Sequence, residues 1–127
     1  MTLIACSHGT RFPEGRDAIH ALIAQVERLL PDVRIAEAFV DVQEPSIDDV
    51  VAGAEGPAVI VPLLLSAGFH TGVDIARAAR TRDDVVATDP LGPHPLLAET
   101  LLARLREAGL RDGDHVVLAA AGSSRAA

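Results

Sequence analysis

Two short polar clusters each follow an apolar run, and each contains a histidine. In "LIACSHGTR", His8 follows the run at residues 2–6, and in "SAGFHTGVD", His70 follows the run at residues 58–65. If both runs are buried strands, each imidazole lies where a strand becomes a loop, at the sheet edge where open α/β folds bind ligands. Neutral imidazoles bind Fe, Co, Ni or Zn well, and an imidazole also accepts protons near neutral pH. We therefore predict that His8 and His70 share one site.

The alternative for each histidine is an ordinary role in a loop, because a single loop histidine is most often solvated or caps a helix. The repetition at two equivalent strand ends, each beside Gly and Ser or Thr, makes the functional interpretation of His8 and His70 as strong as this alternative. We expect His20, inside a helical pattern, and His115, at the start of an apolar run, to be structural or surface residues. His94 lies between two prolines and is intermediate.

Charged residues near these clusters offer further ligands. Asp41 and Glu44, in "FVDVQEP", lie at the end of the strand expected at residues 34–41. Either carboxylate would complete a metal site or accept protons, and the alternative is a solvated turn acid. Three arginines, by contrast, are candidates for binding carboxylates on a substrate, with an ordinary surface role as the alternative: Arg11, Arg77 and Arg80.

The elements that must position these residues alternate between two hydrophobic periods. Because strands alternate with helices, the sequence predicts an α/β fold with a doubly wound, mostly parallel, four-stranded sheet flanked by helices. The run at 58–65 is apolar on both faces, as expected for a central strand, and we expect the first and third strands to be neighbours. Residues 66–72 are predicted to be a loop. The expected strands are 2–6, 34–41, 58–65 and 84–89, and the expected helices are 16–30, a short helix capped by Ser46, 73–80 and 95–108.

The end of the chain repeats its beginning. "HVVLAAAGSSRA" at residues 115–126 has the apolar run and small polar turn of "TLIACSHGTRF" at residues 2–12, but has no histidine at the turn. This predicts an extra C-terminal strand, which is either the closing strand of a complete domain or the first strand of a second, degenerate copy. We expect an α/β domain at residues 1–110 and the C-terminal strand within residues 111–127.

Composition excludes several classes of partner. The chain has 127 residues, a formal net charge of −7 and 2% aromatic residues, which argues against nucleic acid. No apolar run approaches the about 18 residues of a membrane helix, so we expect no membrane partner and a soluble, cytoplasmic protein. The single cysteine, Cys6, cannot form an intrachain disulfide, and its apolar surroundings predict a buried bystander.

Four segments, in their order along the chain, resemble the sirohydrochlorin chelatase family, the cobalt or iron chelatases of cobalamin and sirohaem biosynthesis. These segments are "LIACSHGTR", "AFVDVQEPS", "VIVPLLLSAGFHTGVDI" and "DPLGPHPLL". The resemblance covers residues 2–108. It implies that His8 and His70 are the catalytic and metal-binding pair, with Asp41 or Glu44 as a further ligand. Family members often have Glu where this chain has Asp41. The residues that the resemblance implies for substrate binding are Ser7, Gly9, Arg11, Gly68, Thr71 and His94.

The resemblance also implies a reaction, in which a divalent metal (Co²⁺, Fe²⁺ or Ni²⁺) is inserted as a substrate into a tetrapyrrole. No organic cofactor is expected. A half-sized chelatase leaves its cleft open on one side, so we expect a homodimer. Two alternatives stay open. One is a non-catalytic module that binds a tetrapyrrole or metal, and the other is a histidine phosphatase, although Ser7 stands where that signature has arginine.

Overall fold

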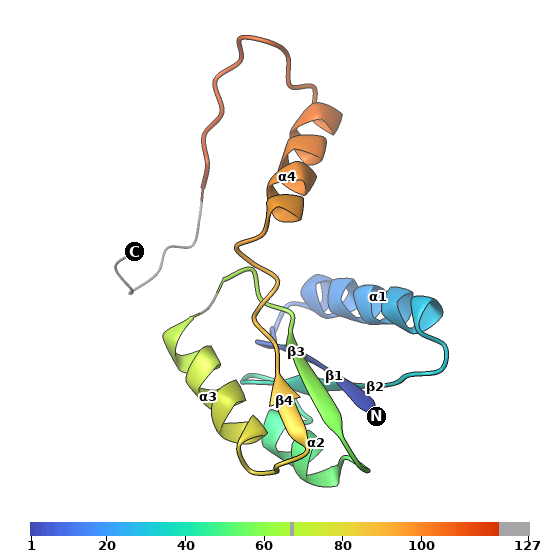
Figure 1. Cartoon of the computed structure of the whole chain (residues 1–127). Helices are drawn as coiled ribbons and strands as arrows, with labels where there is room; N and C mark the ends of the chain where they lie inside the picture. The colour runs from blue at the N-terminus through green and yellow to red at the C-terminus, as the bar shows by residue number, and fades with distance from the viewer. Residues whose placement is uncertain (67, 120–127) are drawn as a thin grey trace.

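The computed structural model describes residues 1–66 and 68–119, without the side chains of residues 69–71 (Figure 1). Within this part, four strands alternate with four helices, and the strands form one parallel sheet in the order β2-β1-β3-β4. The predicted fold class and the predicted adjacency of the first and third strands are therefore confirmed. The elements are β1 (Thr2–Ser7), α1 (Pro13–Leu29), β2 (Arg34–Phe39), α2 (Ile47–Gly53), β3 (Ala58–Pro62), α3 (Phe69–Ala79), β4 (Val85–Ala87) and α4 (Pro95–Glu107).

Local sequence signals set several of these boundaries. Helix α1 begins with Pro13, whose fixed φ suits the first turn of a helix. Helix α2 begins after Ser46, whose hydroxyl oxygen accepts a hydrogen bond from the Asp49 backbone N–H at 3.1 Å. Strand β3 ends at Pro62, because proline has no N–H for the sheet. Each of these residues therefore fixes where an element begins or ends.

The core lies on the face of the sheet that α2 and α3 cover. Alternate strand residues such as Ile4, Cys6 and Ile60 are fully buried there, and Val51 of α2 and Ile75 of α3 pack against them. Helix α1 covers the opposite face and contains no buried residue. The two faces of the sheet are thus covered very unequally.

Helix α4 does not cover the sheet, which corrects our expectation that the helix at 95–108 flanks it. The helix projects away from the sheet (Figure 1), and it buries no residue. Leu96 and Leu101 are 61% and 55% exposed. The face beside α1 is left with an apolar hollow of about 170 Å³, which is lined in part by Leu3, Leu63 and Leu91.

The predicted C-terminal strand is wrong over the residues that the structure describes. Residues 115–119 form no strand, and Val117 and Leu118 are 90% and 78% exposed. The physical reason is the direction of α4, which carries the segment away from the sheet edge, so the apolar run has no strand to pair with. The rest of the predicted strand, residues 120–127, lies outside the described residues.

Cys6 is buried, as predicted, and burial raises the pKa of its thiol from an ordinary 9.0 to about 12. We expect no reaction of the native protein with an aromatic disulfide reagent at pH 8, since the thiolate is the nucleophile. One thiol should react after unfolding in urea. Because the folded state holds this proton to higher pH than the unfolded chain, the thiol's contribution to stability is lost as pH rises from 9 toward 12. Rapid reaction of the native protein would contradict the burial of Cys6.

Candidate functional site

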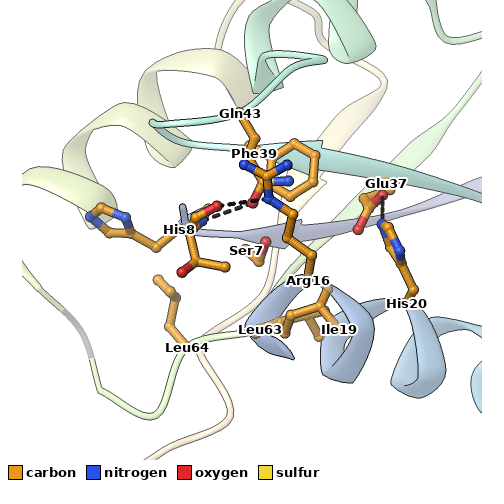
Figure 2. A pocket seen from close by; sticks show the side chains of 13 residues that line it. Ser7, His8, Arg16, Ile19, His20, Glu37, Phe39, Gln43, Leu63 and Leu64 are labelled. Carbon is orange, nitrogen blue, oxygen red and sulfur yellow. Dashed lines mark hydrogen bonds and ion pairs between the residues drawn. The ribbon is translucent and has the colours of Figure 1, made fainter. Parts of the chain in front are cut away.

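The candidate site is a hollow of about 260 Å³ at the carboxyl ends of β1 and β2, between the sheet and the first turns of α1. Figure 2 shows its side chains, which come from β1 and the loop after it, α1, β2 and the chain after β3. Ser7, His8 and Gly9 all line it. The hollow is open to solvent, so a ligand larger than the hollow can enter it in part.

The backbone around His8 is held by a tight contact between two loops. The Asp41 N–H donates to the His8 carbonyl oxygen at 3.0 Å. Gly9 has φ +93°, and a Cβ atom there would lie 2.1 Å from the Asp41 carbonyl oxygen. Only glycine allows both this φ and this approach without strain. The loop that presents His8 is therefore fixed against the loop after β2.

His8 itself is exposed, and Figure 2 shows its imidazole directed away from Arg16 and His20. The chain that leads to His70 starts beside it, because β3 pairs with β1 and the Leu63 N–H donates to the Cys6 carbonyl oxygen at 2.7 Å. The side chain of His70 lies outside the described part of the structure. The convergence of the two imidazoles therefore stays a prediction.

His70 and Thr71 lie in a helix, not in the loop that we expected at residues 66–72. Helix α3 begins at Phe69 and has Gly68 at its N-cap position, and the Gly72 N–H donates to the Gly68 carbonyl oxygen at 3.0 Å. Gly72 made the segment look like a loop, but a glycine in a helix costs only about 1 kcal/mol relative to alanine. The correction places His70 in the first turn of α3.

The candidate carboxylates lie in a neighbouring hollow. Asp41 and Glu44 line a space of about 380 Å³ that shares Phe39 and Gln43 with the hollow beside His8. One Asp41 carboxylate oxygen accepts the Val42 backbone N–H at 2.7 Å. The described side chains include no group of three or more His, Cys, Asp or Glu that could hold a metal ion. A metal role for Asp41 or Glu44 therefore also stays a prediction.

A pair of facing residues in the hollow was not predicted from the sequence. His20, which we expected to be structural or on the surface, lines the hollow, and its Nε2 lies 3.2 Å from Glu37 Oε2 (Figure 2). The signal for Glu37 was a lone acid in the otherwise apolar stretch "IAEAF". Among the described side chains, Glu37 Oε1 and Ser7 Oγ are buried without a hydrogen-bond partner. Buried polar atoms of this kind need an explanation, and a ligand in the hollow would supply one.

The other candidates lie apart from the hollow. His94 Nδ1 accepts the Leu96 backbone N–H at 3.2 Å, so this imidazole caps α4. Arg77 joins α3 to α2 through Asp48 at 2.9 Å, and this hydrogen bond raises the pKa of the guanidinium. Arg80 is the C-cap residue of α3, at the far end from His70. Arg11 is exposed and does not line the hollow.

A four-stranded parallel sheet with a histidine-bearing hollow at its carboxyl edge defines the general class of an α/β protein that binds ligands at this edge. Comparison with known proteins then gives the family. The model of the CbiX family matches residues 2–108, and the chain belongs to this family.

Curated relatives and a solved structure agree with this assignment. The chain is 24% identical over 123 residues to a sirohydrochlorin cobaltochelatase of Methanosarcina barkeri, with 84% of this chain and 95% of the relative covered. It is 26% identical over 123 residues to the enzyme of that name from Methanococcoides burtonii, covering 83% and 94%. A putative cobalamin biosynthesis CbiX protein from Marinobacter aquaeolei has a similar fold, with a TM-score of 0.62 at 22% identity over 84% of this chain and 93% of that one.

A probable sirohydrochlorin cobaltochelatase of Halobacterium salinarum is 30% identical over 131 residues, which cover 90% of this chain but 44% of that protein. This relative is thus more than twice as long as the part that aligns.

Across the residues that the structure describes, none of the helices combines the length and the apolar character that crossing a membrane requires.

Proposed function

We propose that this protein is a chelatase that inserts a divalent metal into sirohydrochlorin, as part of cobalamin biosynthesis. Family membership over residues 2–108 supports the proposal, as do the relatives named sirohydrochlorin cobaltochelatase. Co²⁺ is the metal that those names favour, with Fe²⁺ and Ni²⁺ as further candidates because imidazole ligands suit all three. The single structural observation that carries the proposal is the position of His8, beside an open hollow at the carboxyl edge of the sheet.

The chemistry of insertion assigns separate tasks to the site. The metal must exchange bound water for ring nitrogens, and two pyrrole N–H groups must each lose a proton to a base. In the proposal, His8 and His70 hold the incoming metal through imidazole nitrogens, and one of them accepts a pyrrole proton as the metal passes to the ring. Ser7, Gly9, Gly68 and Thr71 contact the substrate, and Asp41 or Glu44 completes the metal site or accepts the second proton.

Anaerobic incubation with sirohydrochlorin and each metal in turn tests this function. We expect the absorbance of the ring to change to that of the metallated product, fastest with Co²⁺. Tight binding of the ring without insertion of any metal would instead favour a carrier module. Turnover of phosphate esters would favour a histidine phosphatase, but Ser7, at the position of the missing arginine, is 4% exposed and supplies no guanidinium.

We also propose a homodimer, supported by the apolar surface that the chain leaves exposed. The apolar hollow beside α1 and the exposed leucines of α4 both leave apolar surface in water. A second copy covering these surfaces would be stabilised by their burial. We expect light scattering to give twice the chain mass, and Leu101→Glu to shift the protein toward monomer. A monomer at high concentration would contradict the proposal.

The cytoplasmic location and the absence of membrane or nucleic-acid partners stay predictions.

A further inference from the structure

Arg16 is an exposed residue that lines the hollow, and most of its hydrogen-bonding capacity is unused within the described part of the chain. Its Nε donates to the Thr10 carbonyl oxygen at 3.0 Å, which fixes the plane of the guanidinium. Its two terminal nitrogens have no partner among the described residues, and Arg16 lines the same hollow as Gln43 (Figure 2). An arginine fixed at Nε presents its two terminal nitrogens as a fork, which matches the two oxygens of a carboxylate.

Further donors in the same hollow are also unused. The Thr10 backbone N–H donates to Gln43 Oε1 at 2.8 Å, which orients this amide and leaves its NH₂ group without a partner in the described structure. Ser7 is 4% exposed, and its Oγ is buried without a partner. A buried hydroxyl left unpaired is costly, so a ligand that accepts a hydrogen bond from it would offset this cost.

The charges in the hollow favour an anion at its arginine end. The one carboxylate that lines it, Glu37, lies beside His20 at 3.2 Å, and Figure 2 shows this pair on the far side of Arg16 from His8. The guanidinium of Arg16 has no such acidic partner in the part of the chain that the structure describes.

We propose that this hollow is a subsite for one peripheral carboxylate of the tetrapyrrole, bound by Arg16 together with Gln43 and Ser7. The inference rests on the proposed function, because it takes the ring to lie over His8. His8 and Arg16 line the same hollow, while the His8 imidazole points away from Arg16. A ring at His8 therefore reaches Arg16 only by its periphery, where its carboxylates are. Arg16 thus orients the ring and takes no part in metal transfer.

The test measures binding of metal-free sirohydrochlorin by absorbance titration, so that it does not depend on insertion. We expect Arg16→Ala to raise the Kd at least about tenfold, equivalent to about 1.4 kcal/mol. Gln43→Glu keeps the acceptor for the Thr10 N–H but replaces the free NH₂ by a negative oxygen, and it should weaken binding by a similar factor. Arg16→Lys should be intermediate, since an ammonium has no fork. The matched control is Arg28→Ala, in the last turn of the same helix, which should change the Kd less than about twofold.

The methyl ester of the ring identifies the group that is bound. Esterification should weaken binding to the wild type, and Arg16→Ala should then cause no further loss. The proposal is overturned if Arg16→Ala, with an unchanged circular dichroism spectrum, binds the free acid as tightly as the wild type, or weakens acid and ester equally. If the wild type inserts metal while the Arg16 variants bind the ring as tightly as the wild type, the subsite proposal alone is overturned. A wild type that binds the ring but inserts no metal would overturn the proposed function alone.

Discussion

Replacing His8 or His70 by alanine is expected to slow metal insertion into sirohydrochlorin at least about tenfold, which corresponds to about 1.4 kcal/mol of barrier. The reason is that each imidazole is proposed either to hold the metal or to accept a pyrrole proton, and the remaining groups cannot replace it. The measurement is the initial rate of the absorbance change under anaerobic conditions, at saturating ring and metal.

The two variants should differ in how much each lowers the metal affinity and how much each lowers the insertion rate. A residue that only accepts protons can be lost with metal binding nearly intact, whereas a ligand lowers metal affinity and insertion together. We expect His70→Ala to lower both, because the first turn of α3 fixes the position of His70 in the chain. His8→Ala should affect turnover at least as much. Titration of the metal-free protein with Co²⁺ separates affinity from rate.

The control for these variants is His115→Ala. His115 is exposed in the segment after α4, and its loss should leave the rate unchanged. His20 is unsuitable as a control because it lines the hollow beside Glu37. Full activity of both His8→Ala and His70→Ala, with circular dichroism showing an intact fold, would falsify the assignment of these two histidines.

Gly9→Ala is expected to destabilise the protein by about 2–4 kcal/mol. A non-glycine residue at φ +93° is strained, and its Cβ would lie 2.1 Å from the Asp41 carbonyl oxygen, which is backbone and cannot move aside as a flexible side chain would. The loops after β1 and β2 would have to separate, which displaces His8. Urea unfolding followed by circular dichroism measures the stability, and the insertion rate should fall as well.

Two other glycines separate the causes of this effect. Gly56 has φ +71° but nothing within 4 Å of a Cβ, so Gly56→Ala measures the backbone strain alone, about 1 kcal/mol. Gly53 has open space and no positive φ, so Gly53→Ala should be neutral or slightly stabilising. If Gly9→Ala cost no more than Gly56→Ala, the close contact with Asp41 would be unimportant.

Much of the architecture was predictable because it depends on local patterns. The alternation of apolar runs with helical stripes predicted four parallel strands and the adjacency of the first and third, and Ser46 predicted where α2 begins. His8 was also found this way, since a polar residue directly after a buried strand must lie at the carboxyl edge of the sheet. In each case neighbours in the chain carry the information.

The tertiary structure alone decided which distant residues meet. His20 faces Glu37, and Arg16 and Gln43 both form hydrogen bonds to Thr10. These contacts depend on how α1 is rotated against the sheet, which no local pattern specifies. The amphipathic stripe of α4 and the apolar run at residues 115–119 suggested burial, yet the structure leaves both exposed. A hydrophobic pattern indicates that a surface can be buried. Whether anything covers that surface depends on the path of the whole chain and on its partners.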